Sequence, residues 1–121
     1  MFIQINTLLN VCDNSGILKV KCIKLKLKNN NKKLNFFGKA SIKKIKKNKY
    51  KIKKGTIYHI LILKKNYTLI RYNGLRVKFD TNSCIILNLN ITAVATRILG
   101  NMLKEVRIYG IKIFIFYKNI I

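Results

Sequence analysis

The sequence predicts a mainly β protein, a small β-barrel that ends in short C-terminal helical turns. Three observations predict it: apolar and cationic residues alternate along much of the chain, short turn motifs separate these stretches, and only one stretch has helical spacing. The chain has 121 residues, and half of them are hydrophobic. This length and composition predict a single domain, residues 1–121, with one modest core.

The first two predicted strands flank a turn. Residues 3–11 begin with alternating apolar and polar side chains and continue into an apolar run. Asp-Asn-Ser-Gly at residues 13–16 is typical of a turn, because Asp and Asn bond their own backbone and glycine accepts positive φ. Residues 18–28 then predict a strand with Leu18 and Val20 on an apolar face and lysines on the other. A slip in this alternation at Cys22–Ile23 indicates a β-bulge.

A dense lysine tract, residues 43–54, overlaps the next predicted strand, residues 40–47. Ile42, Ile45, Tyr50 and Ile52 interrupt the lysines at intervals. This pattern favours a projecting hairpin over a disordered segment.

The second half of the chain predicts further strands. Residues 57–63 form a near-continuous apolar run, as expected of a buried strand. Asn73-Gly74, between residues 67–72 and 75–79, is a strong hairpin signal. Another strand is expected at residues 84–89. Residues 101–107 have helical character, with Asn101 as a cap and Leu103 and Val106 on one face, and residues 111–117 alternate again.

Charge is the strongest compositional signal. The chain has 26 lysine and arginine residues against 3 acidic ones, a formal net charge of +23. A compact domain with this charge repels itself and needs a polyanion. Nucleic acid is the usual partner, because basic side chains release its counterions, and an anionic membrane surface is the alternative. The longest apolar stretch, residues 111–121, is interrupted by lysine and too short to span a bilayer, so no membrane insertion is expected.

The residues that enzymes and metal sites require are scarce. His59 lies within an apolar strand, where a packed role is expected over a catalytic one, and Asp13 and Asp80 are expected to form turns. The cysteines show no metal-binding or disulfide spacing, so they are expected to be buried or half-buried thiols in a reducing compartment. We therefore expect no enzymatic activity, no catalytic residue, no metal and no cofactor.

The candidate RNA-binding residues are cations on strand faces, on the lysine tract and around the predicted hairpin. Their contacts to phosphate would give affinity and position rather than base sequence. Arginine adds a planar fork that suits phosphate. Tyr50, Tyr67 and Tyr72 lie among cations, where base stacking and a core or interface role are both open. The candidate residues are Lys19, Lys21, Lys43, Lys44, Lys46, Lys47, Lys49, Lys51, Lys53, Lys54, Arg71, Arg76 and Lys78.

Five motifs in order give the chain a resemblance to a known family. They are I-Q-x-x-T-x-L-N-V-x-D-N-S-G at residues 3–16, K-V-K-C-I-K at 19–24, N-G-x-x-x-x-F-D-x-N-x-C at 73–84, T-R-I-L-G at 96–100 and K-E-V-R at 104–107. With these motifs the chain resembles the large-subunit ribosomal protein L-fourteen family, in its bacterial type, along nearly its whole length.

The resemblance implies a five-stranded barrel with a projecting β-ribbon and a C-terminal helical region. It implies binding to large-subunit ribosomal RNA and a bridge to small-subunit ribosomal RNA. It also implies two protein neighbours, a ribosomal protein of the L-nineteen family and a ribosome silencing factor. Thr96, Arg97 and Lys112 match the positions at which the family meets the bridge or this factor.

Two other functions and several locations stay open at this point. A free-standing OB-type single-strand-binding barrel would need an aromatic face, and a cationic membrane-surface peptide would need a long amphipathic helix. Lys, Asn and Ile, whose codons are AT-rich, make up nearly half of the chain, and the N-terminus has neither a secretory signal nor a transit-peptide composition. An organellar ribosome is therefore expected, with a mitochondrion favoured over a plastid or apicoplast. The cytoplasm of an AT-rich bacterium is the alternative.

Overall fold

The computed structural model describes residues 3–26, 37–46, 52–66, 68–90, 92–95 and 97–104. These residues form strands and no α-helix. The strands are β1 (Leu8–Val11), β2 (Ile17–Lys26), β3 (Phe37–Ile45), β4 (Ile57–Lys64), β5 (Leu69–Ile70), β6 (Arg76–Val77) and β7 (Ser83–Leu87).

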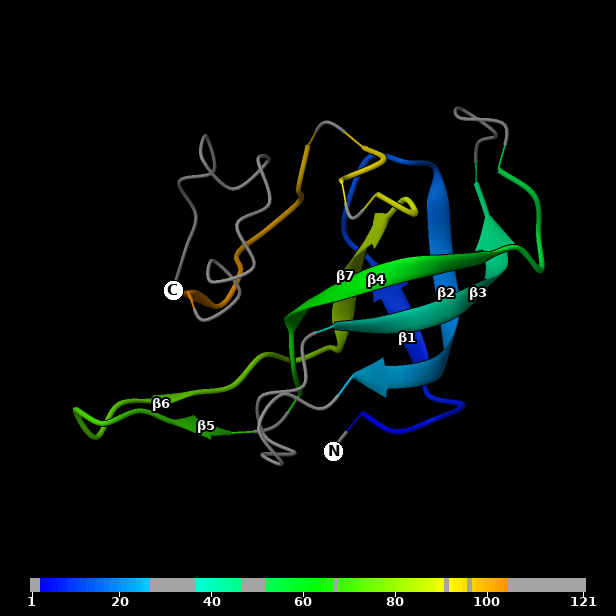
Figure 1. Ribbon diagram of the computed structural model, residues 1–121. Coiled ribbons are helices and arrows are strands. Elements are labelled where there is room, and N and C mark those ends of the chain that lie inside the picture. The colour runs from blue at the N-terminus through cyan, green and yellow to red at the C-terminus, as the bar shows by residue number, and fades with distance from the viewer. Residues whose placement is uncertain are drawn as a thin grey trace.

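Five strands close into a barrel in the order β1-β2-β3-β4-β7, as Figure 1 shows. The successive pairs from β1 to β4 are antiparallel, and so are β4 and β7. The barrel closes where β1 and β7 run parallel, with Asn10 beside Ser83 and Val11 beside Cys84. Closure gives each of these five strands a neighbour on both sides, and it confirms the five-stranded barrel that the resemblance implied.

The turn at residues 13–16 also helps to close the barrel. One carboxylate oxygen of Asp13 accepts hydrogen bonds from the backbone N–H (3.1 Å) and the hydroxyl (2.5 Å) of Ser15. Its other oxygen accepts the N–H of Ile86 in β7, at 3.1 Å. Gly16 has φ 89°, a conformation that glycine adopts without strain. The predicted turn is confirmed, and its aspartate ties the β1–β2 connection to the last barrel strand.

Aliphatic side chains from all five barrel strands fill the interior. We call this set the interior cluster; it comprises Leu9, Ile17, Val20, Cys22, Ala40, Ile42, Ile52, Ile60, Ile62, Cys84 and Ile86.

A second apolar cluster lies on the opposite face of β4 and β7, where residues 98–103 cover it. Leu103 donates its backbone N–H to the carbonyl of Leu63 (3.1 Å), which holds the covering segment on β4. Both faces of β4 are therefore buried from Ile60 to Leu63, which explains the continuous apolar run, although Ile57 is 55% exposed. This outer cluster comprises Cys12, Leu61, Leu63, Ile85, Leu87, Ile98, Met102 and Leu103.

Strand β2 has the predicted apolar and cationic faces, with one correction. The pairing with β3 shifts register between Cys22 and Lys24, which confirms the bulge. Further shifts flank Lys19, and there Ile17 is buried while Leu18 is 36% exposed. The prediction that Leu18 belongs to the apolar face was wrong, because these irregularities rotate the start of the strand.

Both ends of the described chain differ from the predicted strand and helix bounds. The first strand begins at Leu8 rather than Ile3, because residues 3–7 form a turn in which Asn6 has φ 71° and Thr7 donates its N–H to the Gln4 carbonyl. Of the helix predicted at 101–107, the described residues 101–104 contain no α-helix, and residues 105–107 lie outside the described part. The strand predicted at 111–117 also lies outside it.

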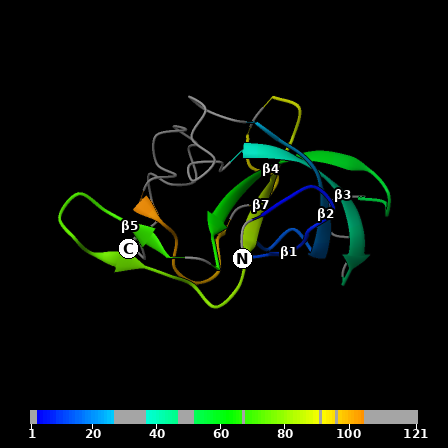
Figure 2. The ribbon, with the colours of Figure 1, turned by 90° about the horizontal axis from the view of Figure 1, so that it is seen from below.

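Strands β5 and β6 form a two-stranded ribbon that projects from the barrel, and both Figure 1 and Figure 2 show it extending away from β2 and β3. Leu69 pairs with Val77 and Ile70 with Arg76. The connecting turn contains Asn73 and Gly74, and Gly74 has φ 84°. The predicted hairpin is confirmed, with shorter strands than expected.

Candidate nucleic-acid interface

Lysines face one another across the β2–β3 pair. Lys19 lies opposite Lys44, and Lys24 lies opposite Lys39; all four side chains are exposed. Like charges directly opposite each other in neighbouring strands destabilise a sheet. An anion against this face would remove that repulsion, so the register favours a polyanionic partner.

The lysine tract is fixed to the barrel at both ends. Lys46 donates its N–H to the Gly16 carbonyl (2.8 Å), and Gly55 donates to the Ile42 carbonyl (2.9 Å). Ile52 is only 3% exposed and packs in the interior cluster, while the lysines after it, Lys53 and Lys54, are exposed. The projecting hairpin predicted for this tract depends on residues 47–51, including Lys47, Lys49, Tyr50 and Lys51, which lie outside the described part.

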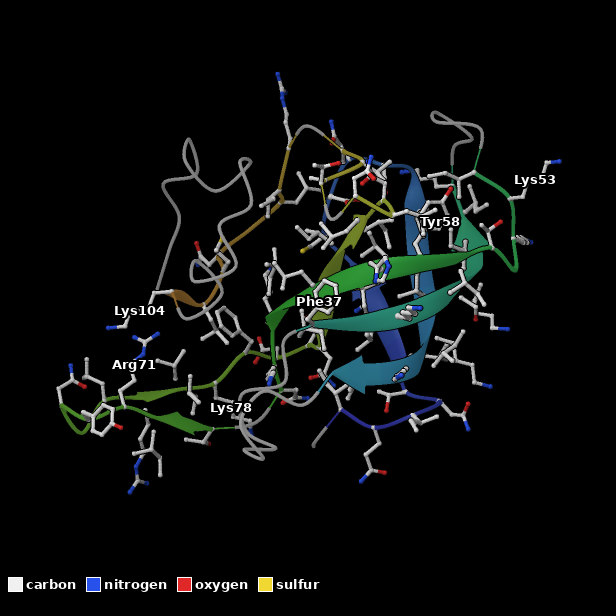
Figure 3. The ribbon with its side chains drawn as sticks, in the orientation of Figure 1. Phe37, Lys53, Tyr58, Arg71, Lys78 and Lys104 are labelled. Carbon is white, nitrogen blue, oxygen red and sulfur yellow. The ribbon has the colours of Figure 1, made fainter. Side chains whose placement is uncertain are left out.

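The ribbon holds a separate cationic group. Arg71 is half-buried, and its N–H donates to the Leu75 carbonyl (2.9 Å) across the turn. Arg76 and Lys78 are exposed. Figure 3 places Arg71 and Lys78 on the ribbon and Lys53 at the opposite end of the molecule.

The predicted RNA-binding residues within the described part thus form two groups rather than one patch. The barrel group comprises Lys19, Lys21, Lys43, Lys44, Lys46, Lys53 and Lys54, of which Lys21 is half-buried and the others exposed. The ribbon group comprises Arg71, Arg76 and Lys78. Tyr72, at the ribbon turn, is fully exposed, which excludes a core role for it; Tyr67 lies outside the described part.

Arg97 is held in place by its backbone. Its N–H donates to the side-chain oxygen of Asn14 (3.0 Å), and the Asn14 N–H donates to the Arg97 carbonyl (3.3 Å). Two residues after Arg97, Leu99 donates its backbone N–H to the Cys12 carbonyl (2.6 Å). The Arg97 side chain is exposed beside the turn at residues 13–16. Thr96 and Lys112, predicted to act with it, lie outside the described part.

His59 has the packed role that was predicted for it. Its ring stacks on Phe37, with centroids 5.4 Å apart and an interplanar angle of 24°, and its buried Nδ1 has no hydrogen-bond partner. Lys24 and Lys39 lie beside this ring pair, and neither they nor Phe37 were among the predicted contact residues. The alternation placed both lysines on cationic faces, but only the strand register brings them together.

The cysteines are free and buried, as predicted. Burial raises the pKa of the Cys12 thiol to about 12 and that of Cys84 well above its ordinary value, so both stay protonated and unreactive at neutral pH. Within the ranges that the structure describes, no group of His, Cys, Asp and Glu side chains could hold a metal ion. The same ranges contain no helix long and apolar enough to cross a membrane.

A closed β-barrel with lysines on its outer face is an architecture found among nucleic-acid-binding proteins. Comparison with protein families narrows this class. The family model described as ribosomal protein L14p/L23e matches residues 2–118. The chain therefore belongs to this family and is a structural constituent of the large ribosomal subunit, which confirms the resemblance seen in the motifs.

Proposed function

We propose that this chain, as a single ribosomal-protein domain of residues 1–121, binds large-subunit ribosomal RNA through phosphate contacts and contributes to an intersubunit bridge. The pairing of Lys19 with Lys44 across two barrel strands carries the proposal. A net charge of +23 on a closed barrel gives the same indication. The proposed function includes no enzymatic activity.

The two cationic groups suit different contacts. Lysines of the barrel group act as point charges that follow a phosphate backbone, whereas the arginines of the ribbon group can make bidentate contacts to phosphate. Two separate groups, one on the barrel and one on the ribbon, would hold separate RNA segments, which is what a protein that fixes folded RNA requires.

Salt dependence tests the phosphate contacts. Replacing Lys46, Lys47, Lys49 and Lys51 together with glutamine should lower affinity for large-subunit RNA. It should also flatten the salt dependence, by roughly 0.7–0.9 in log K per log salt for each phosphate that the variant no longer neutralises. The matched control replaces the same lysines with arginine and should keep the slope. An unchanged slope in the glutamine variant would place the tract away from phosphate.

Association with the particle tests the proposal as a whole. The wild-type chain should co-sediment with large subunits in low salt and be stripped from them by high salt. Free protein at low salt would contradict the ribosomal role.

The bridge and the silencing factor form the second part of the proposal. Thr96, Arg97 and Lys112 are the residues proposed to contact small-subunit ribosomal RNA or the factor. The exposed Arg97 side chain and its fixed backbone support this role. Arg97→Glu should impair subunit joining or factor binding more than assembly into the large subunit, whereas Arg76→Glu on the ribbon should impair assembly more. Equal assembly and joining defects for Arg97→Glu would argue against the bridge role.

A ribosomal protein of the L-nineteen family is the proposed protein neighbour. Exposed apolar side chains on the ribbon, Ile70 and Leu75, support a protein contact in addition to RNA. Ile70→Asp should weaken binding to the purified neighbour, and Ile57→Asp on the barrel should not. If both variants weakened binding to the neighbour equally, the exposed apolar residues of the ribbon would no longer support this protein contact.

The ribosome that contains this chain is proposed to be organellar, with a mitochondrion favoured over a plastid, an apicoplast or an AT-rich bacterium. The abundance of Lys, Asn and Ile supports a gene in an AT-rich genome. An antibody against the chain should detect it in ribosomes from purified mitochondria; detection only in plastid or cytoplasmic ribosomes would correct the location.

A further inference from the structure

A pocket lies on the outer face of β2, β3 and β4, among residues that the proposed phosphate contacts do not use. Its volume is about 240 Å³, and it is lined by Lys24, Phe37, Gly38, Lys39 and His59. Pockets for drug-sized ligands are roughly 300–1,000 Å³. This pocket therefore suits a ligand about as large as one planar ring system.

The strand register builds the pocket. Lys24, Lys39 and His59 lie side by side on β2, β3 and β4, and Phe37 is two residues before Lys39, on the same face of β3. Figure 3 shows Phe37 at the start of β3, where this strand runs beside β4. Two lysines and two stacked rings are thus gathered within three adjacent strands.

Gly38 allows the two cationic strands to approach closely. A Cβ atom at this position would collide with the backbone carbonyl oxygen of Lys24. Only glycine therefore lets β3 pass so near to β2 at this point, which keeps Lys24 next to Lys39. The pocket depends on a feature of the backbone as well as on its side chains.

We propose that this pocket binds one unstacked nucleobase of the RNA, with the ammonium groups of Lys24 and Lys39 on the adjoining phosphates. The inference rests on the proposed function, since it needs an RNA partner. Aromatic rings offer a stacking surface to any base, and flanking lysines complement the phosphates on either side of it. A phosphate contact alone would need neither ring.

The test uses the full chain and two RNA duplexes of the same sequence, one fully paired and one with a single unpaired fluorescent purine analogue. The wild-type chain should bind the bulged duplex more tightly and change the fluorescence of the analogue as the base stacks. Phe37→Leu should lower the affinity for the bulged duplex about tenfold, a typical effect of removing one stacked base, and keep the affinity for the paired one.

Matched variants separate stacking from charge and from folding. Phe37→Trp should keep the preference for the bulge, and Tyr72→Leu, which removes an exposed aromatic ring from the ribbon, should keep it too. The double variant Lys24→Gln with Lys39→Gln should lower the affinity for the bulged duplex more than the affinity for the paired one. The double variant Lys43→Gln with Lys44→Gln should lower both affinities equally. The lysine variants decide the matter if Phe37→Leu does not fold, which thermal unfolding would show.

The failures of the two proposals are distinguishable. Equal binding of both duplexes by the wild type, or an intact preference in Phe37→Leu, would overturn the base pocket and leave the phosphate contacts standing. Stronger binding of an acidic peptide than of the bulged duplex would also overturn it. No binding of either duplex in low salt would instead contradict RNA binding itself.

Discussion

The closed barrel and the β5–β6 ribbon use the same kinds of residues in opposite surroundings. Ile60 in the barrel is completely buried, whereas Ile70 in the ribbon is 65% exposed. The barrel is stabilised by an interior to which every strand contributes. A two-stranded ribbon is marginally stable by itself, so its order depends on what it contacts. The comparison teaches that substitutions in the barrel interior should affect folding, whereas substitutions of exposed residues in the ribbon should affect binding.

The junction between the two regions explains how the ribbon is held. Leu69 and Val77, which pair across the ribbon, are partly buried against the outer cluster, and so is Phe79. Phe79 also donates its N–H to the carbonyl of Lys65 (3.1 Å), just after β4. The base of the ribbon is therefore anchored on the barrel, while its turn is exposed.

The largest difference in the free energy of unfolding is expected when an isoleucine is replaced by alanine in the barrel and, separately, in the ribbon. Ile60→Ala should lower the free energy of unfolding by about 2–5 kcal/mol, because it leaves a cavity in the interior cluster. Ile70→Ala should change it by less than about 0.5 kcal/mol, as exposed positions usually do. Urea unfolding of the two variants measures both values. Similar decreases would show that the ribbon is as integral to the core as the barrel strands.

The junction should respond to pH. Burial lowers the pKa of Lys65 from 10.5 to about 8. Below pH 8 the folded state bears the full cost of the buried charge; between pH 8 and 10.5 it releases the proton while the unfolded chain keeps it, so stability rises with pH. The rise should approach about 3 kcal/mol at 1.36 kcal/mol per pKa unit.

The lysine contribution is isolated by comparing variants. Lys65→Met should be more stable than the wild type below pH 8, with a difference that shrinks towards pH 10.5. The high pKa of Cys12 lowers stability above pH 9 in every variant, so only differences between variants are compared. A constant difference for Lys65→Met across this range would contradict the buried charge.

A smaller loss of stability is expected from a substitution at Asp13, where the turn at residues 13–16 is tied to β7. Asp13→Ala removes the acceptor for Ser15 and for the Ile86 N–H, which should cost about 1–3 kcal/mol. Asp80→Ala, at an exposed position after the ribbon, should cost less than about 0.5 kcal/mol. Thermal unfolding compares the two directly. If both aspartates cost the same, Asp13 is only a turn residue and does not tie the strands together.

Local patterns predicted local structure well in this chain. The turn at residues 13–16, the bulge after Cys22 and the hairpin at Asn73-Gly74 each depend on a few adjacent residues, and each is confirmed. Leu18 was misplaced because two register shifts, invisible in the alternation, rotate the strand. The start of the first strand was wrong because alternation at Ile3–Asn6 coincides with a turn.

Features that depend on residues far apart in the sequence could not be predicted from the local alternation of apolar and polar residues. The outer cluster needs residues 98–103 to return to β4, and the apolar run in β4 predicts burial without saying what covers it. The pairing of Lys24 with Lys39 needs the register of β2 against β3, which each strand alone leaves free. Candidate phosphate contacts were therefore foreseeable as a charge pattern, but the pocket beside Phe37 and His59 was not.

The parallel contact between β1 and β7 has a consequence for synthesis of the chain. Strands β1 to β4 follow one another in sequence and can pair as each emerges, but β1 acquires its second neighbour only when residue 84 is available. Until then the edges of β1 and β4 are open to other growing chains. Nascent molecules that stall in this window should be prone to aggregate, and the completed barrel should not.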